Sequence, residues 1–174
     1  EREAFGAAGV RLADVTVVDN DSRDGSAAVI RDAIAANGWD AWVRLIESPV
    51  NGGFAFGNNT ALRDATARSA IYEYVWLLNP DTVVRPGALK ALTDFLDAHP
   101  RTGLAGSSVE EDDQGTRWPY AFRFPSAVAE FEQAIRMGPI SKLLDRWVVA
   151  MRMGDEPEQA QWLSGWSIMI RGKV

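Results

Sequence analysis

The residues that decide the fold class are VTVVDNDSRDGSAAVIRDAIAANG, numbers 15–38. The β-branched run at their start predicts a buried strand that ends at Asp19. A polar, glycine-containing turn follows. Apolar side chains then recur at helical spacing over 27–38, and the closing Asn37-Gly38 is typical of a helix C-terminus. The stretch therefore predicts a strand, a turn and a helix in succession.

The same alternation continues along the chain. Further strands are predicted at 42–48, 72–79 and 103–109, a glycine- and asparagine-rich loop at 51–59, and further helices at 59–69 and from Pro86 onward. This order predicts an α/β domain with a largely parallel sheet flanked by helices. Polar clusters follow the first three strands. Because such sheets bind ligands at the carboxyl ends of their strands, we expect these clusters to gather at one rim.

The pattern weakens after residue 109. We expect a hairpin turn over 110–118, irregular chain at 121–126 and 138–160, a helix at 127–137 and a strand-like segment at 161–172. A length of 174 residues suits a single domain. The chain does not begin with Met, and it stops directly after a strand-like run. We therefore expect a fragment of a domain, cut at both ends.

Composition excludes several classes of protein. The 47% hydrophobic and 24% charged residues are those of a folded chain, and the net charge of −6 argues against a general nucleic-acid binder. The absence of cysteine excludes thiolate metal sites and cysteine nucleophiles, and the single histidine, His99, excludes multi-histidine metal sites. No apolar run approaches the roughly 18–20 residues that span a bilayer, and the first residues do not form a signal peptide.

The segment LLNPDT, residues 77–82, carries the first candidate site residue. Asn79-Pro80 forces a turn at the end of a strand, because the residue before proline is kept out of the helical region. Asp81 then presents a carboxylate there, and Mg²⁺ or Mn²⁺ needs one or two carboxylates plus phosphate oxygens of a ligand. The alternative is that Asn-Pro-Asp is only a turn sequence.

Two more polar clusters follow strands. Asp19 lies at the end of the first strand with Asn20 and Asp21, where a carboxylate could accept hydrogen bonds from a ribose or a base; Asp24 or Ser26 is expected only to cap the next helix. NGGFAFGNN, residues 51–59, offers glycines for close backbone approach and asparagine amides near a helix start, which favours anionic ligands. Turn and backbone requirements alone could explain both clusters.

A fourth candidate segment is WLSGWSIMI, residues 162–170. The small Ser164-Gly165 pair between two tryptophans leaves a gap with an aromatic wall, on which a sugar ring can stack. Trp166 is the candidate for that contact, with packing in the core as its alternative. We expect core positions for Trp39, Trp42, Trp76 and Trp147.

The order of these motifs is more specific than any one of them. VVDNDSRDGS, ESPVNGGFAFGNN, VWLLNPDTVVRPGAL, GLAGSSV, RFPS and WLSGWSIMIRG together resemble the inverting family 2 glycosyltransferases, which use nucleotide-sugar donors. The similarity runs from about Val15 to Arg171 and is greatest to the rhamnosyltransferase-like branch that builds bacterial cell-surface polysaccharides. It implies the GT-A fold, a Rossmann-like sheet flanked by helices, for one incomplete catalytic domain over 1–174.

The resemblance also implies roles for individual residues. Asp19 matches the acidic residue that contacts the base or ribose, and Asp81 matches the metal-binding aspartate, with Mn²⁺ or Mg²⁺ as the metal. Asn79 stands at the first position of the family's Asp-x-Asp motif. The remaining matches are Asn51, Gly53 and Asn58 on the nucleotide-sugar side, and Ser164, Gly165 and Trp166 beside the donor sugar and acceptor.

The resemblance further implies a UDP- or dTDP-sugar donor, a glycan or lipid-linked glycan acceptor, and no nucleic acid. The expected location is the cytoplasm, with peripheral attachment at the inner face of the plasma membrane if the acceptor is lipid-linked. The family's opening strand has no counterpart before Val15, and its general base is expected beyond Val174. Residues 1–174 alone are thus expected to lack the catalytic base and part of the nucleotide site.

Two other functions stay open at this point. An aspartyl-phosphate hydrolase would use Asp19 as its nucleophile, but it would place threonine where Arg23 stands and would need a lysine further along. A non-catalytic, receiver-like binding module would also cluster acids at strand ends. Such a module would not account for NGGFAFGNN or for the tryptophan-flanked Ser-Gly pair, and fold alone does not separate these functions.

Overall fold

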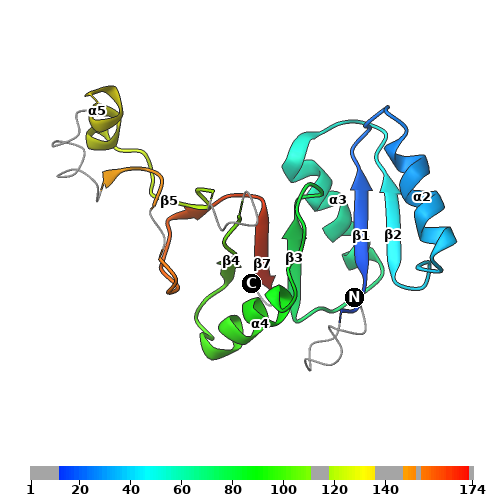
Figure 1. Ribbon diagram of the computed structural model, residues 1–174. Helices are drawn as coiled ribbons and strands as arrows, with labels where there is room; N and C mark the ends of the chain where they lie inside the picture. The colour runs from blue at the N-terminus through cyan, green and yellow to red at the C-terminus, as the bar shows by residue number, and fades with distance from the viewer. Residues whose placement is uncertain (1–11, 111–117, 136–146, 152–153, 173–174) are drawn as a thin grey trace. The chain divides into compact units, whose positions relative to one another are not determined.

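The computed structural model describes residues 12–110, 118–135, 147–151 and 154–172 (Figure 1). The chain divides between Glu73 and Tyr74 into two compact units. The first 11 residues, most of the predicted hairpin at 110–118 and the predicted helix end at 136–137 lie outside the described residues.

The first unit contains the predicted strand–helix alternation. Its strands, β1 (Val15–Asp19) and β2 (Val43–Glu47), are parallel and in register from Val15–Val43 to Asp19–Glu47. The crossover between them is α2 (Ser26–Ala36), and α3 (Gly53–Ala67) follows β2. α2 packs on β2 and α3 on β1 (Figure 1). Parallel strands bring their carboxyl ends together, so the chain after Asp19 and the chain after Glu47 emerge at the same rim.

The end of α2 follows the prediction closely. The N–H of Asn37 donates to the Ala33 carbonyl at 3.2 Å, and the Asn37 side-chain amide donates to the same oxygen at 2.7 Å. Gly38 has φ +63°, the left-handed conformation that closes a helix and that glycine adopts without steric cost. The chain turns back there. Ile34 of α2 and Val43 of β2 are both buried in the core of this unit.

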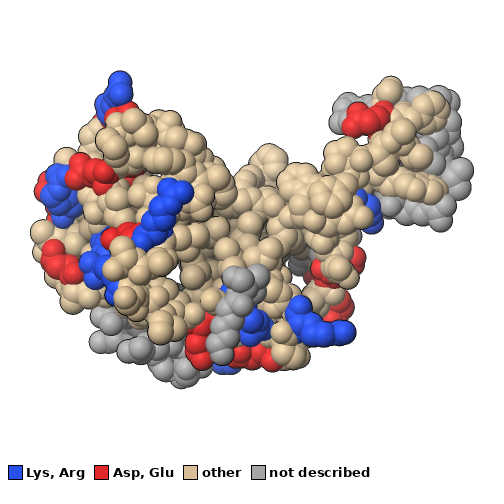
Figure 2. All heavy atoms as spheres, turned by 180° about the vertical axis from the view of Figure 1, so that it is seen from behind, with Lys and Arg blue, Asp and Glu red and all other residues tan. Residues whose placement is uncertain are grey.

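An ionic cluster ties the end of α3 to the start of β1. The Tyr72 hydroxyl donates to Asp14 at 2.8 Å, and the Arg68 guanidinium contacts Asp64 at 2.8 Å and Asp14 at 3.4 Å. Burial and the Asp14 carboxylate both raise the pKa of Tyr72, burial contributing more. On the face seen in Figure 2, acidic and basic side chains of this unit are interspersed. Two further ion pairs of the unit are Arg31–Glu47 and Arg44–Asp14.

The second unit is built on a three-stranded sheet of order β3-β7-β4. The strands are β3 (Tyr74–Leu78), β4 (Leu104–Gly106) and β7 (Ser167–Arg171), and β7 is antiparallel to both neighbours. The α/β class predicted from the sequence is confirmed. The described sheets combine one parallel pair with antiparallel pairs, because the strand-like segment at 161–172 returns between β3 and β4.

The helix α4 (Ala88–Ala98) supplies the core of this unit. The helix packs on β4, and its buried leucines are Leu89, Leu92 and Leu96. Leu96 is fully buried, as is Met169 of β7. The helix begins two residues after Pro86, contrary to the prediction, because Gly87 has the left-handed φ of +85° and acts as the N-cap. Pro100 follows its end as predicted, and the Arg171 guanidinium donates to the Leu96 carbonyl.

The rest of the unit consists of short elements. β5 (Ala121–Phe122) pairs antiparallel with β6 (Trp162–Leu163), within a region predicted to be irregular at 121–126. The rings of Phe122 and Trp162 stack with centroids 4.1 Å apart and planes 14° apart. α5 (Ala127–Ile135) occupies the predicted helix. In the part of the chain that the structure describes, no helix is long and apolar enough to cross a membrane.

Candidate functional site

Asn20 organises the rim of the first unit. Its side-chain amide donates to the Asn51 side-chain oxygen and to the Gly53 carbonyl, both at 3.1 Å. Its side-chain oxygen accepts the N–H of Gly52 at 3.3 Å. The chain after β1 thus holds the chain after β2, and the polar clusters that follow the first two strands lie together as predicted. The sequence places Asn20 at this rim, but the bonds at both ends of its amide depend on the folded backbone of the second loop.

The residues predicted as a loop at 51–59 are mostly helical. α3 begins at Gly53, so only residues 51 and 52 belong to a loop. Side chains that would disfavour a helix here bond to it instead: the Gly53 N–H donates to the Asn51 side chain at 3.1 Å, and the Asn58 amide donates to the Phe54 carbonyl at 3.1 Å. Asn51 and Gly53 therefore flank the helix start, and Asn58 lies in its second turn.

Gly52 is required by packing. A Cβ at this position would lie 2.2 Å from Cγ of Phe56 and 2.6 Å from its Cβ. Gly52 itself has φ −94°, which any residue can adopt, so the requirement is steric. The glycine lets the loop approach the first turn of α3 closely.

The aspartates in the turn after β1 make different contacts. Asp19 accepts the N–H of Ser22 at 3.4 Å, a weak contact that leaves its carboxylate available. Asp21 and Arg23 form a two-pronged ion pair, and both have left-handed backbones, with φ of +59° and +54°. Asp24 accepts the Ser26 N–H at 2.9 Å and its hydroxyl, contacts that lower the pKa of Asp24. The N-cap of α2 is Gly25, with a left-handed φ of +88° and no side-chain cap bond, so the predicted capping by Asp24 or Ser26 is wrong; Asp24 instead binds Ser26, the first residue of the helix, from the preceding turn.

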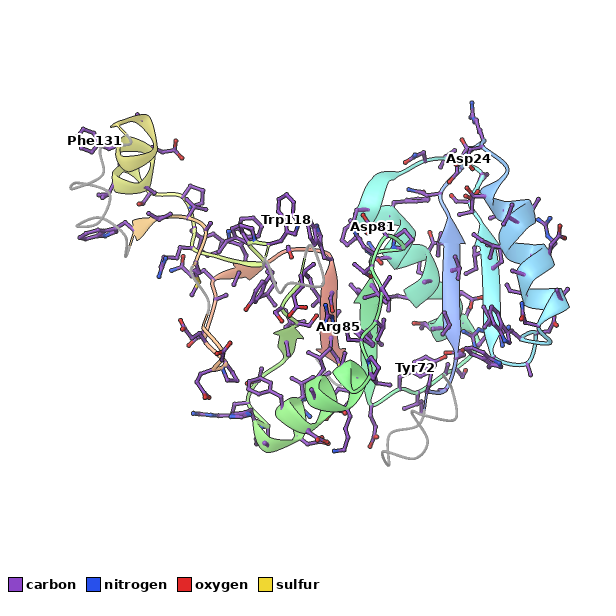
Figure 3. All side chains as sticks on the ribbon, viewed as in Figure 1. Asp24, Tyr72, Asp81, Arg85, Trp118 and Phe131 are labelled. Carbon is purple, nitrogen blue, oxygen red and sulfur yellow. The ribbon has the colours of Figure 1, made fainter. Side chains whose placement is uncertain are left out.

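The second unit holds the turn that carries Asp81. The Asn79 carbonyl accepts the Thr82 N–H at 3.2 Å and the Thr82 hydroxyl at 2.6 Å, which closes the turn over Pro80. The Asn79 N–H donates to the Trp166 carbonyl at 2.9 Å. Asp81 is exposed at this end of the sheet (Figure 3). The structure therefore brings Asn79, Asp81 and Trp166 together within one unit.

A polar network fixes the Ser-Gly-Trp segment. The Ser164 N–H donates to the Tyr120 carbonyl at 2.9 Å, and the next strand begins at buried Ser167. The Ser167 hydroxyl accepts the indole N–H of Trp76 at 3.0 Å and contacts the Ser107 hydroxyl at 2.7 Å. Trp42, Trp76 and Trp147 are half-buried and Trp39 is exposed, so the core positions predicted for these four tryptophans are wrong. Trp166 is half-buried as well and contacts the ring of Trp118.

The described residues fit a metal only together with a ligand. Within residues 12–110, 118–135, 147–151 and 154–172, no three side chains of His, Asp or Glu converge as a metal cluster. The Asp81 carboxylate makes no hydrogen bond or ion pair with any residue in those ranges. Mg²⁺ and Mn²⁺ are often held by one or two carboxylates and by phosphate oxygens of the substrate, so a single free carboxylate suits that mode.

Comparison with known proteins identifies the family. The family "Glycosyl transferase family 2" matches residues 11–155, and the chain belongs to this family. Its members have the GT-A fold. The matched residues include the Asn20 rim of the first unit and the Asn79-Pro80-Asp81 turn of the second.

Two curated relatives come from Mycobacterium tuberculosis, strains CDC 1551 / Oshkosh and ATCC 25618 / H37Rv. Each is an N-acetylglucosaminyl-diphospho-decaprenol L-rhamnosyltransferase, 28% identical over 172 residues and aligned with 92% of this chain. The chain spans 52% of the length of these relatives. No solved structure matches the chain significantly. The rhamnosyltransferase-like character expected from the motifs is confirmed, and the hydrolase and receiver-like alternatives lose their support.

Proposed function

We propose that this chain transfers a sugar from a nucleoside-diphosphate donor to an acceptor hydroxyl with inversion, in the synthesis of a bacterial cell-surface polysaccharide. The observation that carries the proposal is the family match over residues 11–155. The relatives act on a diphospho-decaprenol-linked N-acetylglucosamine and transfer L-rhamnose. For this chain we propose a UDP- or dTDP-linked sugar as donor and a lipid-linked glycan as acceptor.

The proposed nucleotide site lies at the rim of the first unit. Asp19 is placed to accept hydrogen bonds from ribose hydroxyls or from a base N–H, since its only contact in the turn is the 3.4 Å bond from Ser22. Asn51 precedes α3, and Gly53 and Asn58 lie in its first two turns, where backbone N–H groups favour an anionic ligand. Asn20 holds this loop in one arrangement and so acts as a positioning residue.

The proposed metal and sugar sites lie in the second unit. Asp81 would hold Mn²⁺ or Mg²⁺ with the donor diphosphate, and Asn79 would place that turn. A bound metal supplies positive charge that stabilises the departing nucleoside diphosphate. Ser164, Gly165 and Trp166 would lie beside the donor sugar and the acceptor, because Trp166 is hydrogen-bonded to Asn79.

The remaining part of the proposal concerns the acceptor. Its hydroxyl would attack the anomeric carbon from the face opposite the nucleotide while a general base accepts its proton, so the configuration inverts. No carboxylate of residues 1–174 is assigned as that base. A lipid-linked acceptor would place the enzyme at the inner face of the plasma membrane.

The first test is calorimetric titration of the protein with UDP, dTDP and their sugars, with and without Mn²⁺. We expect tighter binding of one nucleotide sugar with Mn²⁺, and loss of that gain in Asp81→Ala. Asp94→Ala is the matched control, since Asp94 is an exposed carboxylate of the same unit, paired with Lys90 on α4. Absence of nucleotide binding to the full-length enzyme would refute the proposal, and equal loss in both variants would refute the role of Asp81.

A further inference from the structure

Trp118 forms an open aromatic corner with Trp166. The two ring centroids lie 5.7 Å apart and the planes are inclined by 58°. Trp118 is 44% exposed, so part of its ring is open to solvent. Its backbone N–H is bound to the Val109 carbonyl at 2.9 Å, so the exposed ring stands on a fixed backbone.

The geometry of this corner differs from that of a packing stack. Phe122 and Trp162 lie nearly parallel at 4.1 Å, so each covers a face of the other. Rings inclined at 58° meet by an edge and leave most of a face open. An open indole face is the surface on which the C–H face of a pyranose ring packs, because both are apolar and nearly flat.

The position of the corner distinguishes it from a similar one elsewhere. Trp39 and Trp42 are inclined by 55° with centroids 5.9 Å apart, but they precede β2 and lie at the end of that strand opposite its carboxyl rim. The Trp118–Trp166 corner is joined to the Asp81 turn through the bond between Asn79 and Trp166. Figure 3 shows Trp118 and Asp81 at the same end of the second unit's sheet.

We infer that Trp118 binds the sugar ring of the acceptor, as the outer wall of a subsite whose inner wall is Trp166. This rests on the proposed function. The contacts run in order from the Asp81 turn to Asn79, then Trp166, then Trp118, so Trp118 is the ring further from the proposed diphosphate site. The donor sugar is attached to that diphosphate and falls nearer Trp166. The ring that meets Trp118 is therefore that of the acceptor.

The test measures binding, so that it does not depend on turnover. The full-length enzyme is titrated with an N-acetylglucosaminyl diphosphate that carries a short prenyl chain, and separately with the nucleotide sugar and Mn²⁺. We expect Trp118→Ala to weaken binding of the acceptor about tenfold and to leave donor binding within about twofold. Trp118→Tyr, which keeps an aromatic face, should restore most of the affinity, whereas Trp118→Leu should not.

Trp39→Ala is the matched control, because it removes a tryptophan of similar exposure from a corner of similar geometry. Circular dichroism and thermal unfolding identify any variant that fails to fold. If Trp118→Ala fails to fold, the comparison of Trp118→Leu with Trp118→Tyr still tests the inference. Acceptor binding unchanged in Trp118→Leu, or a loss confined to the donor, would overturn the inference. An enzyme that binds donor with Mn²⁺ but not this acceptor would also overturn it, while leaving the donor half of the proposed function intact.

Discussion

The backbone N–H of Asn79 donates to the carbonyl oxygen of Trp166 at 2.9 Å, immediately beyond the last paired residues of β3 and β7, Leu78 and Ser167. The bond extends the ladder by one step into the two segments that carry the candidate site of this unit. The carboxylate-bearing turn and the aromatic segment are therefore held by backbone atoms. Side-chain changes at either position can alter chemistry without releasing the turn.

The network beneath this bond predicts a stability effect. Replacing Ser167 with valine leaves the Trp76 indole N–H and the Ser107 hydroxyl without their shared partner inside the sheet. Because a buried polar group that loses its partner costs about 1–3 kcal/mol, Ser167→Val should lower the free energy of unfolding by that amount. Urea unfolding measures it. The exposed neighbour Ser108 provides the control, and Ser108→Val should change stability by less than about 0.5 kcal/mol.

The loop between β2 and α3 predicts a steric effect. In Gly52→Ala the added Cβ would meet the Phe56 ring, whose Cγ would lie 2.2 Å away. The resulting strain should cost about 1–3 kcal/mol in unfolding free energy. Phe56→Ala in the same chain should relieve the part of that cost that comes from the ring, because only the Phe56 Cβ, 2.6 Å away, then remains. A double-mutant cycle detects this relief as a coupling between the two sites. Gly154→Ala, where a Cβ would meet nothing within 4 Å, should be neutral.

The hydrogen bonds of the Asn20 side chain predict an effect on nucleotide binding. Asn20→Asp keeps the oxygen that accepts the Gly52 N–H but replaces the donor to Asn51 and Gly53 with a second oxygen. Repulsion from the Gly53 carbonyl should open the loop, and nucleotide binding should weaken about tenfold, equivalent to about 1.4 kcal/mol. Calorimetry with UDP or dTDP measures this. Asn59→Asp, an exposed change on α3 itself, should bind nucleotide as the wild type does. Equal nucleotide affinities of Asn20→Asp and Asn59→Asp would contradict the positioning role of Asn20.

The raised pKa of Tyr72 predicts that the stability of the fold declines at alkaline pH. Burial and the Asp14 carboxylate raise its pKa from the ordinary value of 10.0, so the folded protein favours the protonated phenol. Its contribution to stability is complete below pH 10 and is lost as the pH rises through the folded-state pKa. Tyr74, whose pKa Asp97 raises, adds to the same loss. Tyr72→Phe should make the decline in unfolding free energy above pH 10 shallower, and an unchanged slope would contradict this assignment.

The sequence predicted well wherever local chemistry decides the structure. β1, α2 and the left-handed Gly38 follow from a β-branched run, helical spacing and an Asn-Gly pair within 24 residues of chain. The helical start of α3 at Gly53 was missed, because glycine and asparagine disfavour helix on propensity. Here side-chain bonds such as Asn58 to Phe54 satisfy the backbone instead.

Long-range pairing was beyond local patterns. The strand-like character of residues 167–171 was visible, but its insertion between β3 and β4 depends on pairing with residues more than 60 positions earlier. The candidate residues Asp81 and Trp166 were therefore found separately, each from its own motif. The antiparallel return of β7 explains why they lie at the same end of the sheet in the second unit.

The Asn79-Pro80-Asp81 turn predicts a change in metal dependence. We propose that Asn79 takes the first position of the family's Asp-x-Asp motif. Its backbone N–H and carbonyl hold the turn in place. Asn79→Asp leaves those backbone bonds intact and adds a second carboxylate beside Asp81. Because Mn²⁺ gains affinity from added anionic oxygen ligands, the Mn²⁺ concentration that gives half-maximal nucleotide-sugar binding should fall severalfold.

Titration of Mn²⁺ at a fixed nucleotide-sugar concentration measures this change. Asn79→Ala removes the amide without adding a carboxylate, so it separates the effect of the added charge from the effect of losing the amide. Gln159→Glu adds the same single negative charge at an exposed position elsewhere in the unit and should leave the Mn²⁺ dependence as it is. A Mn²⁺ requirement that stays the same in Asn79→Asp would mean that the metal is not held at this turn. An increase restricted to Asn79→Asp would instead mean that the amide oxygen of Asn79 serves the site better than a carboxylate does.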